Sequence, residues 1–304
     1  MQAIKQLPSV SVGIPAYNEA NNIGLLISDI LKQSTRKYNI ENIIIASDGS
    51  TDNTEDIVNS FKNKKVIFIN NLNREGVASR QNELLRESNS DILVLLNADI
   101  RIDDSLFIEK LIDPIKHKRA DLTSPALKET PPRTYFESVI IAGMQLKNVL
   151  FETWRNGQNG YMCHGAVRAF SKRLYKQINF RKGNGEDMYS YLFCLMKNYK
   201  FSFVPEAHVW YRSPSTFNDH LKQSIRFFKY QNDFRKQLDS ILVANEINIP
   251  KYILIKGGIK SIPLFLKYPI RTICYVFFVI EIKLLLMINM TPKDLWNAKT
   301  TKHQ

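Results

Sequence analysis

A group of amide and acidic side chains follows an apolar run in the first half of the chain. The run 93–96 is followed by Asn97 and Asp99, and then by Asp103 and Asp104. A carboxylate placed directly after a buried strand is costly unless a cationic group meets it. A polar loop or a helix cap is the simpler explanation for such a segment. It explains Asp99 poorly, so Asp99 is a candidate for binding a cation.

A second acidic pair, Glu186 and Asp187, lies at the expected start of a helix. Acidic side chains are favoured in the first turn of a helix, so a structural role explains the pair without any chemistry. A carboxylate within hydrogen-bond reach of a hydroxyl can also take its proton. The pair therefore has a structural and a catalytic interpretation.

The first half of the chain alternates between strand-like and helix-like segments. Because single helices separate the strands, we expect parallel pairing with right-handed crossovers. The apolar runs are nearly continuous, as in strands that are covered on both faces. This pattern predicts a doubly wound, mostly parallel α/β sheet. Strands are expected at 10–15, 42–47, 66–70 and 91–96, and helices at 21–33, 52–61 and 76–87.

Polar or acidic loops follow all four expected strands. In such sheets, ligands bind at the carboxyl ends of the strands, so these loops should meet at one edge. Neither G-x-G-x-x-G after the first strand nor G-x-x-x-x-G-K-[ST] is present, which disfavours a dinucleotide-binding fold and a P-loop. The loops read AYNEANN, SDGSTDNT, NNLNREG and NADIRIDD.

The composition limits the class of protein. The 304 residues suffice for one large domain with an appendage, and 44% hydrophobic with 23% charged content argues against global disorder. A net charge of +13 suits an anionic partner, such as nucleic acid, nucleotide phosphates or an acidic membrane surface. The three cysteines are widely spaced, which indicates a reducing compartment. The first nine residues lack the apolar stretch of a signal peptide.

Six motifs together resemble family 2 glycosyltransferases, which are inverting enzymes with a GT-A type fold. The resemblance covers about residues 10–228 and implies a catalytic domain at 1–245. Its nucleotide-sugar half would span about 1–120 and its acceptor half about 121–245, with a helical, membrane-associated segment at 246–304. The motifs are VSVGIPAYNEANNI, SDGSTDNT, NREGVASRQNE, LLNADI, GNGEDMYSYL and QSIRFF.

The resemblance implies a set of donor-binding residues in the first half. The loop after the first strand and the acid of SDGS would hold the base and ribose, where carboxylates can accept from N–H and hydroxyl groups. Two arginines would lie near the diphosphate, although a solvated helix face is an alternative for the second. Ser47 stands where the family often has another acid, so a UDP-sugar and a GDP-sugar both remain open. The residues are Pro15, Tyr17, Glu19, Asp48, Arg74 and Arg80.

The resemblance also implies a divalent cation at the segment NAD. Asp99 takes the position of the second acid of the family's D-x-D motif and would bind Mg²⁺ or Mn²⁺ through carboxylate oxygen. Asn97 replaces the first acid and brings no charge. His208 would supply a further metal ligand. A purely structural histidine is the alternative.

In the acceptor half, the resemblance implies that Asp187 is the general base of an in-line displacement. The neighbouring acid Glu186 would lie at the same site. His164 and Gly165 belong to a small-residue segment that would line the sugar and acceptor site, ahead of a strand and a helix start within 163–175.

QSIRFF resembles the Q-x-x-R-W motif of membrane polysaccharide synthases. Gln223 and Arg226 share a helix face, so Arg226 would meet diphosphate charge. Phe227 stands where tryptophan usually packs beneath the acceptor, which leaves processive synthesis in doubt. An ordinary amphipathic helix is the alternative.

The segment from residue 252 is rich in apolar residues but is interrupted by basic ones. Its uncharged stretches fall short of the roughly 18–20 residues that a spanning helix needs. Basic residues among bulky apolar ones suit helices in an anionic membrane interface. A packed helical subdomain or a dimer contact would explain the same pattern.

The expected function is transfer of a sugar from a nucleotide-sugar donor to a hydroxyl or phosphate acceptor. The acceptor would be a lipid-linked saccharide, another glycan or a polyprenyl phosphate, at the cytoplasmic face of a membrane. We expect no nucleic-acid partner. The alternatives are a soluble or protein acceptor, or a catalytically silent nucleotide-sugar-binding protein, to which the uncharged Asn97 would point.

Overall fold

The computed structural model describes residues 7–181, 185–225 and 240–287. The described chain divides into two compact units, each built from two segments. The first unit combines residues up to 128 with 163–210, and the second combines 129–162 with the residues from 211 onward. The expected functional boundaries near residues 120 and 245 stay predictions.

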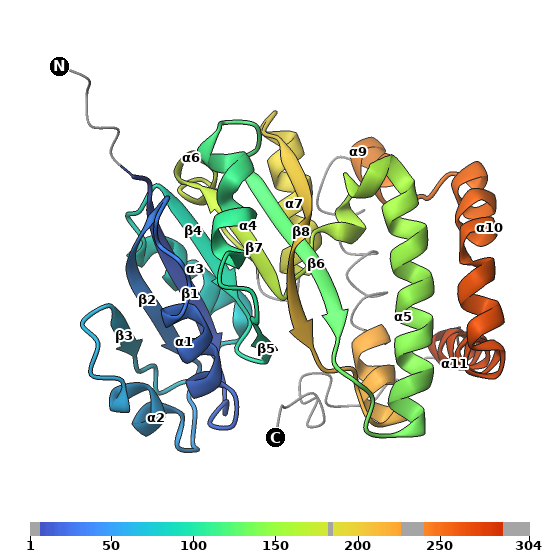
Figure 1. The fold of residues 1–304 in the computed structure, drawn as a ribbon, viewed down its shortest axis with the longest axis horizontal. Coiled ribbons are helices and arrows are strands. Elements are labelled where there is room, and N and C mark those ends of the chain that lie inside the picture. The colour runs from blue at the N-terminus through green and yellow to red at the C-terminus, as the bar shows by residue number, and fades with distance from the viewer. Residues whose placement is uncertain (1–6, 182–184, 226–239, 288–304) are drawn as a thin grey trace. The chain divides into compact units, whose positions relative to one another are not determined.

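The first unit is organised around an eight-stranded sheet in the order β3-β2-β1-β4-β7-β6-β8-β5 (Figure 1). Most residues of β1 and β2 and all residues of β4 are buried, which explains their nearly continuous apolar sequences. The strands are β1 Ser9–Ala16, β2 Asn39–Ser47, β3 Val66–Ile69, β4 Ile92–Leu96, β5 Ile100–Arg101, β6 Leu122–Glu129, β7 Val167–Ser171 and β8 Phe201–Tyr211.

The predicted parallel pairing is confirmed for the first four strands and wrong for part of the second half. β1 pairs in parallel with β2 and β4, and β2 pairs in parallel with β3. β7, by contrast, is antiparallel to both β4 and β6. The alternation of strands with single helices ends after β4, so the rule that predicts parallel crossovers no longer applies there. The sheet is therefore mixed.

The helices of the first unit place the strand-end loops. Gly13 of β1 allows α3 to approach the sheet closely, because a Cβ at this position would lie 3.0 Å from Leu95 and 3.2 Å from Leu84 of α3. Gly76 precedes α3 with a positive φ of 99°. The helices are α1 Ile23–Leu31, α2 Thr54–Ser60, α3 Val77–Glu87, α4 Phe107–Lys116, α6 Lys172–Tyr175 and α7 Glu186–Met196.

The second unit is helical. Its long helix α5 begins with a capping box between Thr134 and Glu137, and Arg212 pairs with Glu137 at 2.7 Å. The helical elements are α5 Tyr135–Thr153, the short 3₁₀ turns Trp154–Gly157 and Gly160–Met162, helical residues 217–225, α9 Ser240–Ile247, α10 Lys251–Lys267 and α11 Pro269–Met287.

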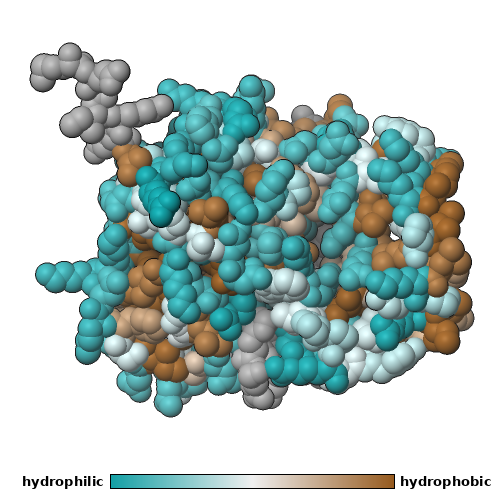
Figure 2. All heavy atoms as spheres, viewed as in Figure 1, coloured by the Kyte–Doolittle hydropathy of each residue, from teal (hydrophilic) through white to brown (hydrophobic). Residues whose placement is uncertain are grey.

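Two glycines let α10 and α11 pack closely on α5. A Cβ at Gly143 would lie 2.2 Å from the Tyr275 ring of α11, and one at Gly257 of α10 would lie 2.7 Å from Leu150. Hydrophobic residues gather over α10 and α11 on the outside of this unit, as Figure 2 shows. Within the described residues, no helix is long and apolar enough to cross a membrane.

Candidate active site

Hydrogen bonds fix the loops after β1 and β2 to each other. Asn18 has a positive φ of 53°, which asparagine tolerates better than most residues. Its backbone N–H donates to Ser50 Oγ at 3.1 Å, and its side-chain oxygen accepts from the Thr51 N–H at 2.8 Å. The Glu19 N–H donates to Thr54 Oγ1 at 2.9 Å. The segment that carries the predicted donor-binding residues is therefore held in place.

Two predicted donor-binding residues meet at this edge of the sheet. The Arg74 guanidinium carbon lies 3.9 Å from the centre of the Tyr17 ring, in the range of a cation–π contact. Pro15 lies at the end of β1, two residues before Tyr17. The loops after β1 and β3 thus meet at one edge of the sheet, as predicted from the positions of the strand ends.

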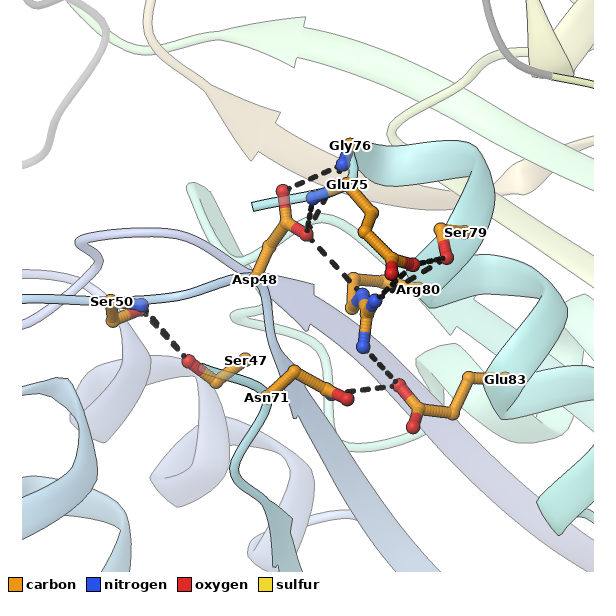
Figure 3. A network of polar contacts seen from close by, with 9 residues as sticks. All are labelled: Ser47, Asp48, Ser50, Asn71, Glu75, Gly76, Ser79, Arg80 and Glu83. Atoms are coloured by element: carbon orange, nitrogen blue, oxygen red, sulfur yellow. Dashed lines mark hydrogen bonds and ion pairs between the residues drawn. The ribbon is translucent and has the colours of Figure 1, made fainter. Parts of the chain in front are cut away.

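Asp48 joins the end of β2 to the loop before α3 (Figure 3). Its buried carboxylate accepts from the Glu75 N–H at 2.8 Å, and each of its oxygens accepts from the Gly76 N–H, at 2.9 and 3.1 Å. Gly49 beside it has a φ of +75°, and a Cβ there would lie 3.1 Å from the Leu72 carbonyl oxygen. The first observed role of Asp48 is therefore to position this loop, and direct contact with a donor stays a prediction.

Arg80 is buried beneath Asp48 rather than exposed on a helix face. Its Nε lies 3.3 Å from Asp48 Oδ1, and its terminal nitrogens donate to Glu75 at 2.7 Å and Glu83 at 2.9 Å (Figure 3). With a side chain 5% exposed and three carboxylate partners, this guanidinium supports the Asp48 carboxylate. The alternative of a solvated helix face is wrong, and the predicted diphosphate contact gains no support from these partners.

The segment NAD, the small-residue turn and the predicted base are neighbours. The Asn97 N–H donates to the Ala166 carbonyl at 2.9 Å. A Cβ at the adjacent Gly165 would lie 3.4 Å from Asp187 Oδ2, and Asp187 Oδ1 accepts from the Met188 N–H at 2.7 Å. The structure thus places the end of β4, the turn before β7 and the start of α7 together, with the Asp187 carboxylate half-buried.

Asp99 and His208 lie on segments that the sheet order brings close together. Asp99 immediately precedes β5, which is the neighbour of β8 in the sheet, and β8 carries His208. His208 Nε2 lies 3.4 Å from Asp103 Oδ1. In the part of the chain that the structure describes, no group of three or more histidine, cysteine or carboxylate side chains could hold a metal ion. A hard divalent cation fits the Asp99 carboxylate but would need oxygen ligands from the substrate.

His164 contributes a half-buried side chain whose Nε2 atom is buried. Its ring Nε2 has no hydrogen-bond partner among the described residues, and its backbone N–H donates to Ser124 Oγ at 2.9 Å. Burial lowers the pKa of His164 to about 4, so its ring is neutral at pH 7. Burial likewise raises the pKa of the neighbouring Cys163 thiol, so this cysteine is not a reactive thiolate.

Arg168, the fully buried second residue of β7, was not predicted as a functional residue. Its terminal nitrogens donate to the Glu186 carbonyl and Ser190 Oγ, both at 2.6 Å, and to Gln81 Oε1 at 3.1 Å. Arg168 therefore ties the start of α7, which carries Asp187, to β7 and α3. A cationic residue inside the apolar strand sequence VRAFS was the available signal, because unpaired charges are rarely buried.

The predicted Q-x-x-R-W residues fall mainly outside the described residues. Gln223 lies in the helical segment 217–225 of the second unit and is half-buried. Arg226 and Phe227 lie outside the described ranges. Their predicted contacts with diphosphate and acceptor stay predictions.

The profile of Glycosyl transferase family 2 matches residues 11–179, more than half of the chain. The chain is 24% identical over 273 residues to the poly-beta-1,6-N-acetyl-D-glucosamine synthase of Staphylococcus aureus (strain MSSA476), covering 85% of this chain and 63% of that protein. The synthase of the same name from Staphylococcus epidermidis is 23% identical, with 91% and 66% covered. The chain thus spans slightly less than two thirds of the length of these curated relatives.

Solved structures of transferases share the fold. A mannosyltransferase from Pyrobaculum calidifontis, in complex with GDP-Man and Mn²⁺, matches with a TM-score of 0.65 at 15% identity, covering 94% of this chain and 89% of that one. Staphylococcus aureus TarS 1–349 with UDP-GlcNAc matches with a TM-score of 0.54 at 15% identity, covering 85% and 79%. These matches confirm the expected GT-A type α/β fold and leave the membrane-interface segment unconfirmed.

Proposed function

The chain belongs to glycosyl transferase family 2, and from that premise we propose how its site moves a sugar. The donor is a nucleotide sugar, and the acceptor oxygen attacks the anomeric carbon from the face opposite the diphosphate. One observation carries the proposal: the Asp187 carboxylate lies against Gly165, and Ala166 is hydrogen-bonded to Asn97 at 2.9 Å. This arrangement joins a carboxylate base to the strand-end loops that would hold the donor.

Asp187 takes the acceptor proton in this mechanism. As the acceptor oxygen bonds to the anomeric carbon, the bond from that carbon to the diphosphate oxygen breaks, and the proton passes to the carboxylate. The Met188 N–H fixes Oδ1, and the absence of a side chain at Gly165 leaves room beside Oδ2. A phosphate acceptor would already be anionic and would need this base less, so a hydroxyl acceptor fits the site better.

The donor side is proposed to use Tyr17, Glu19 and Arg74, on loops that Asp48 and Asn18 hold in place. Relatives named for N-acetylglucosamine polymers favour a UDP-N-acetylhexosamine, and the mannosyltransferase with GDP-Man makes a GDP-sugar the second candidate.

A divalent cation, Mg²⁺ or Mn²⁺, is proposed at Asp99. Two structural neighbours contain Mn²⁺ with a nucleotide, the mannosyltransferase above and a Mycobacterium tuberculosis glucosyl-3-phosphoglycerate synthase (TM-score 0.53, 16% identity, 80% of each chain). When bound, such an ion offsets the charge on the departing nucleoside diphosphate. His208 is the second proposed ligand, although in the structure it faces Asp103.

The proposed acceptor is a lipid-linked saccharide of cell-surface glycan assembly. It would be used at the cytoplasmic face of the membrane. The support is the excess of basic residues and the exposed apolar side chains of α10 and α11. A soluble or protein acceptor is one competing proposal. A catalytically silent nucleotide-sugar-binding protein is another, and the uncharged Asn97 motivates it.

A thermal-shift panel of UDP- and GDP-sugars, with and without Mn²⁺, tests the donor proposal. We expect one nucleotide class to raise the melting temperature, and more so with the metal. Release of nucleoside diphosphate from that donor then separates an enzyme from a silent binder. The donor proposal fails if no nucleotide sugar shifts the melting temperature under either condition.

A further inference from the structure

The outward sides of α10 and α11 are apolar along their whole lengths. On α10 the exposed side chains recur at intervals of three and four residues, so they share one face. These are Tyr252, Ile255, Ile259, Ile262 and Leu266. The same spacing recurs on α11 in Ile270, Ile273, Phe277, Ile280, Leu284 and Met287.

These faces lie opposite those that pack on the rest of the unit. α10 buries Ile253 and Gly257, and α11 buries Tyr275 and Ile282. Both helices are therefore apolar on two sides, and the described residues cover one of them. Contiguous exposed apolar surfaces of this kind mark contacts with a partner or a membrane.

The charges on the two helices select an anionic surface over a second copy of the chain. Two copies meeting through these faces would bring like charges together, whereas an anionic bilayer complements them. Glu281 is the single acidic residue of 251–287, against the basic residues Lys251, Lys256, Lys260, Lys267, Arg271 and Lys283.

A groove between α5 and α10 lies beside the outward face of α10. Its volume is about 440 Å³, and Val149, Pro263 and Leu264 form its apolar part. Lys260 and Lys267 line it, two helical turns apart on the same side of α10. Consecutive residues of a helix point about 100° apart, so Pro263 and Lys267 lie on the flank of α10, between its packed side and the outward face that carries Ile262 and Leu266.

Glu152 of α5 also lines the groove. Burial raises the pKa of its carboxyl, and the positive charge of Lys260 opposes this shift. The groove therefore combines apolar side chains, the amides of Gln145 and Asn148, two ammonium groups and one carboxyl group. Its two lysines against one acidic residue suit an anionic amphiphile better than a cationic one.

We propose that the α5–α10 groove binds one anionic phospholipid of the bilayer. Its phosphate lies between Lys260 and Lys267, and its chain passes over Val149, Pro263 and Leu264 toward the outward face of α10. Ammonium groups bind phosphate through charge-assisted hydrogen bonds, which are stronger than neutral ones. This inference rests on the proposed membrane association and adds to it a single, saturable lipid site.

Vesicle flotation with a matched-charge control tests the groove. Neutral phosphatidylcholine vesicles are compared with vesicles that also contain phosphatidylglycerol, for the wild type and two double variants. Lys260→Gln/Lys267→Gln changes the groove, and Lys251→Gln/Lys283→Gln removes the same charge elsewhere on α10 and α11. All four lysines are exposed, so both variants should keep the wild-type melting temperature.

We expect the groove variant to bind phosphatidylglycerol vesicles about tenfold more weakly than the control variant. In native mass spectrometry, the wild type and the control should retain one phosphatidylglycerol and the groove variant none. Equal losses in both variants would overturn the groove while leaving membrane association intact. Displacement of the lipid by inorganic phosphate alone would overturn the assignment to a lipid. A wild type that floats with neither vesicle would refute the membrane association itself.

Discussion

Asp99 carries the one carboxylate of the segment 97–99, so metal-dependent donor binding should depend on it. Asp99→Ala should abolish the Mn²⁺-dependent part of nucleotide-sugar affinity, because a hard cation loses its carboxylate ligand. Asn97→Asp should strengthen that part by adding charge. Calorimetry with and without Mn²⁺ measures both effects. Unchanged Mn²⁺-dependent affinity in Asp99→Ala would move the metal away from this segment.

Arg168 is expected to act as a positioning residue for Asp187. Arg168→Met removes the hydrogen bonds to the Glu186 carbonyl and Ser190 Oγ, so the start of α7 should lose its fixed geometry. We expect kcat to fall about tenfold or more while donor Kd stays near the wild-type value. Arg168→Lys should recover part of the loss, because lysine keeps the charge without the planar fork. If donor affinity falls in parallel with kcat, or if kcat is unchanged at an intact melting temperature, Arg168 does not position the base.

The positions of the loop residues could be predicted where they follow the carboxyl ends of parallel strands, because these ends lie at one edge of the sheet. The meeting of Tyr17 with Arg74 followed from loops at one sheet edge, whereas Gly165 and Asp187 were placed at the site by the family resemblance. The environments of Arg80 and Arg168 were not predictable, because burial of a guanidinium depends on which acceptors the tertiary fold brings to it.

The packing of α5 on α11 depends on Gly143, whose missing side chain makes room for Tyr275. Gly143→Ala should lower the free energy of unfolding by about 1–3 kcal/mol, since the new Cβ would lie 2.2 Å from the ring. Gly258→Ala on α10 is the control, because nothing lies within 4 Å of its Cβ position. It should raise stability by about 0.5–1 kcal/mol through helix propensity alone. Urea denaturation measures both, and a neutral or stabilising Gly143→Ala would show that α11 packs elsewhere.

At the scale of elements, the periodicity of apolar residues predicted strands and helices with a strong pattern of their own. It missed features that depend on neighbouring elements. β1, β4 and α3 were predicted to within a few residues because their apolar patterns are strong. The antiparallel pairing of β7 was missed, since nothing in a strand's own sequence records the direction of its neighbour. The long helix α5 was also missed, because it packs on both α10 and α11 and its apolar residues therefore do not keep to one face.

The whole molecule carries a net charge of +13, and its exposed apolar residues are concentrated on α10 and α11. Binding to anionic vesicles should therefore have a salt-sensitive and a salt-resistant part, because charge attraction is screened within about 10 Å at 0.1 M salt and apolar burial is not. Ile259→Ser/Phe277→Ser should remove most of the salt-resistant part. Leu25→Ser/Leu106→Ser, which changes exposed apolar residues of the first unit, should not. Flotation across a salt series separates the two parts, and equal effects of both variants would contradict a specific membrane face.

The central claim is that this family 2 chain transfers a sugar with Asp187 as the general base. The most direct test compares the turnover of the Asp187→Asn variant with that of the wild type. Release of nucleoside diphosphate and the affinity for the donor are measured on the wild type and the variant, with the donor that the thermal-shift panel selects. The amide cannot accept the proton but keeps the size of the side chain, so donor Kd should be unchanged while turnover falls by about 10² or more. Near-normal turnover with intact donor binding would contradict the claim and make Glu186 the next candidate for the base.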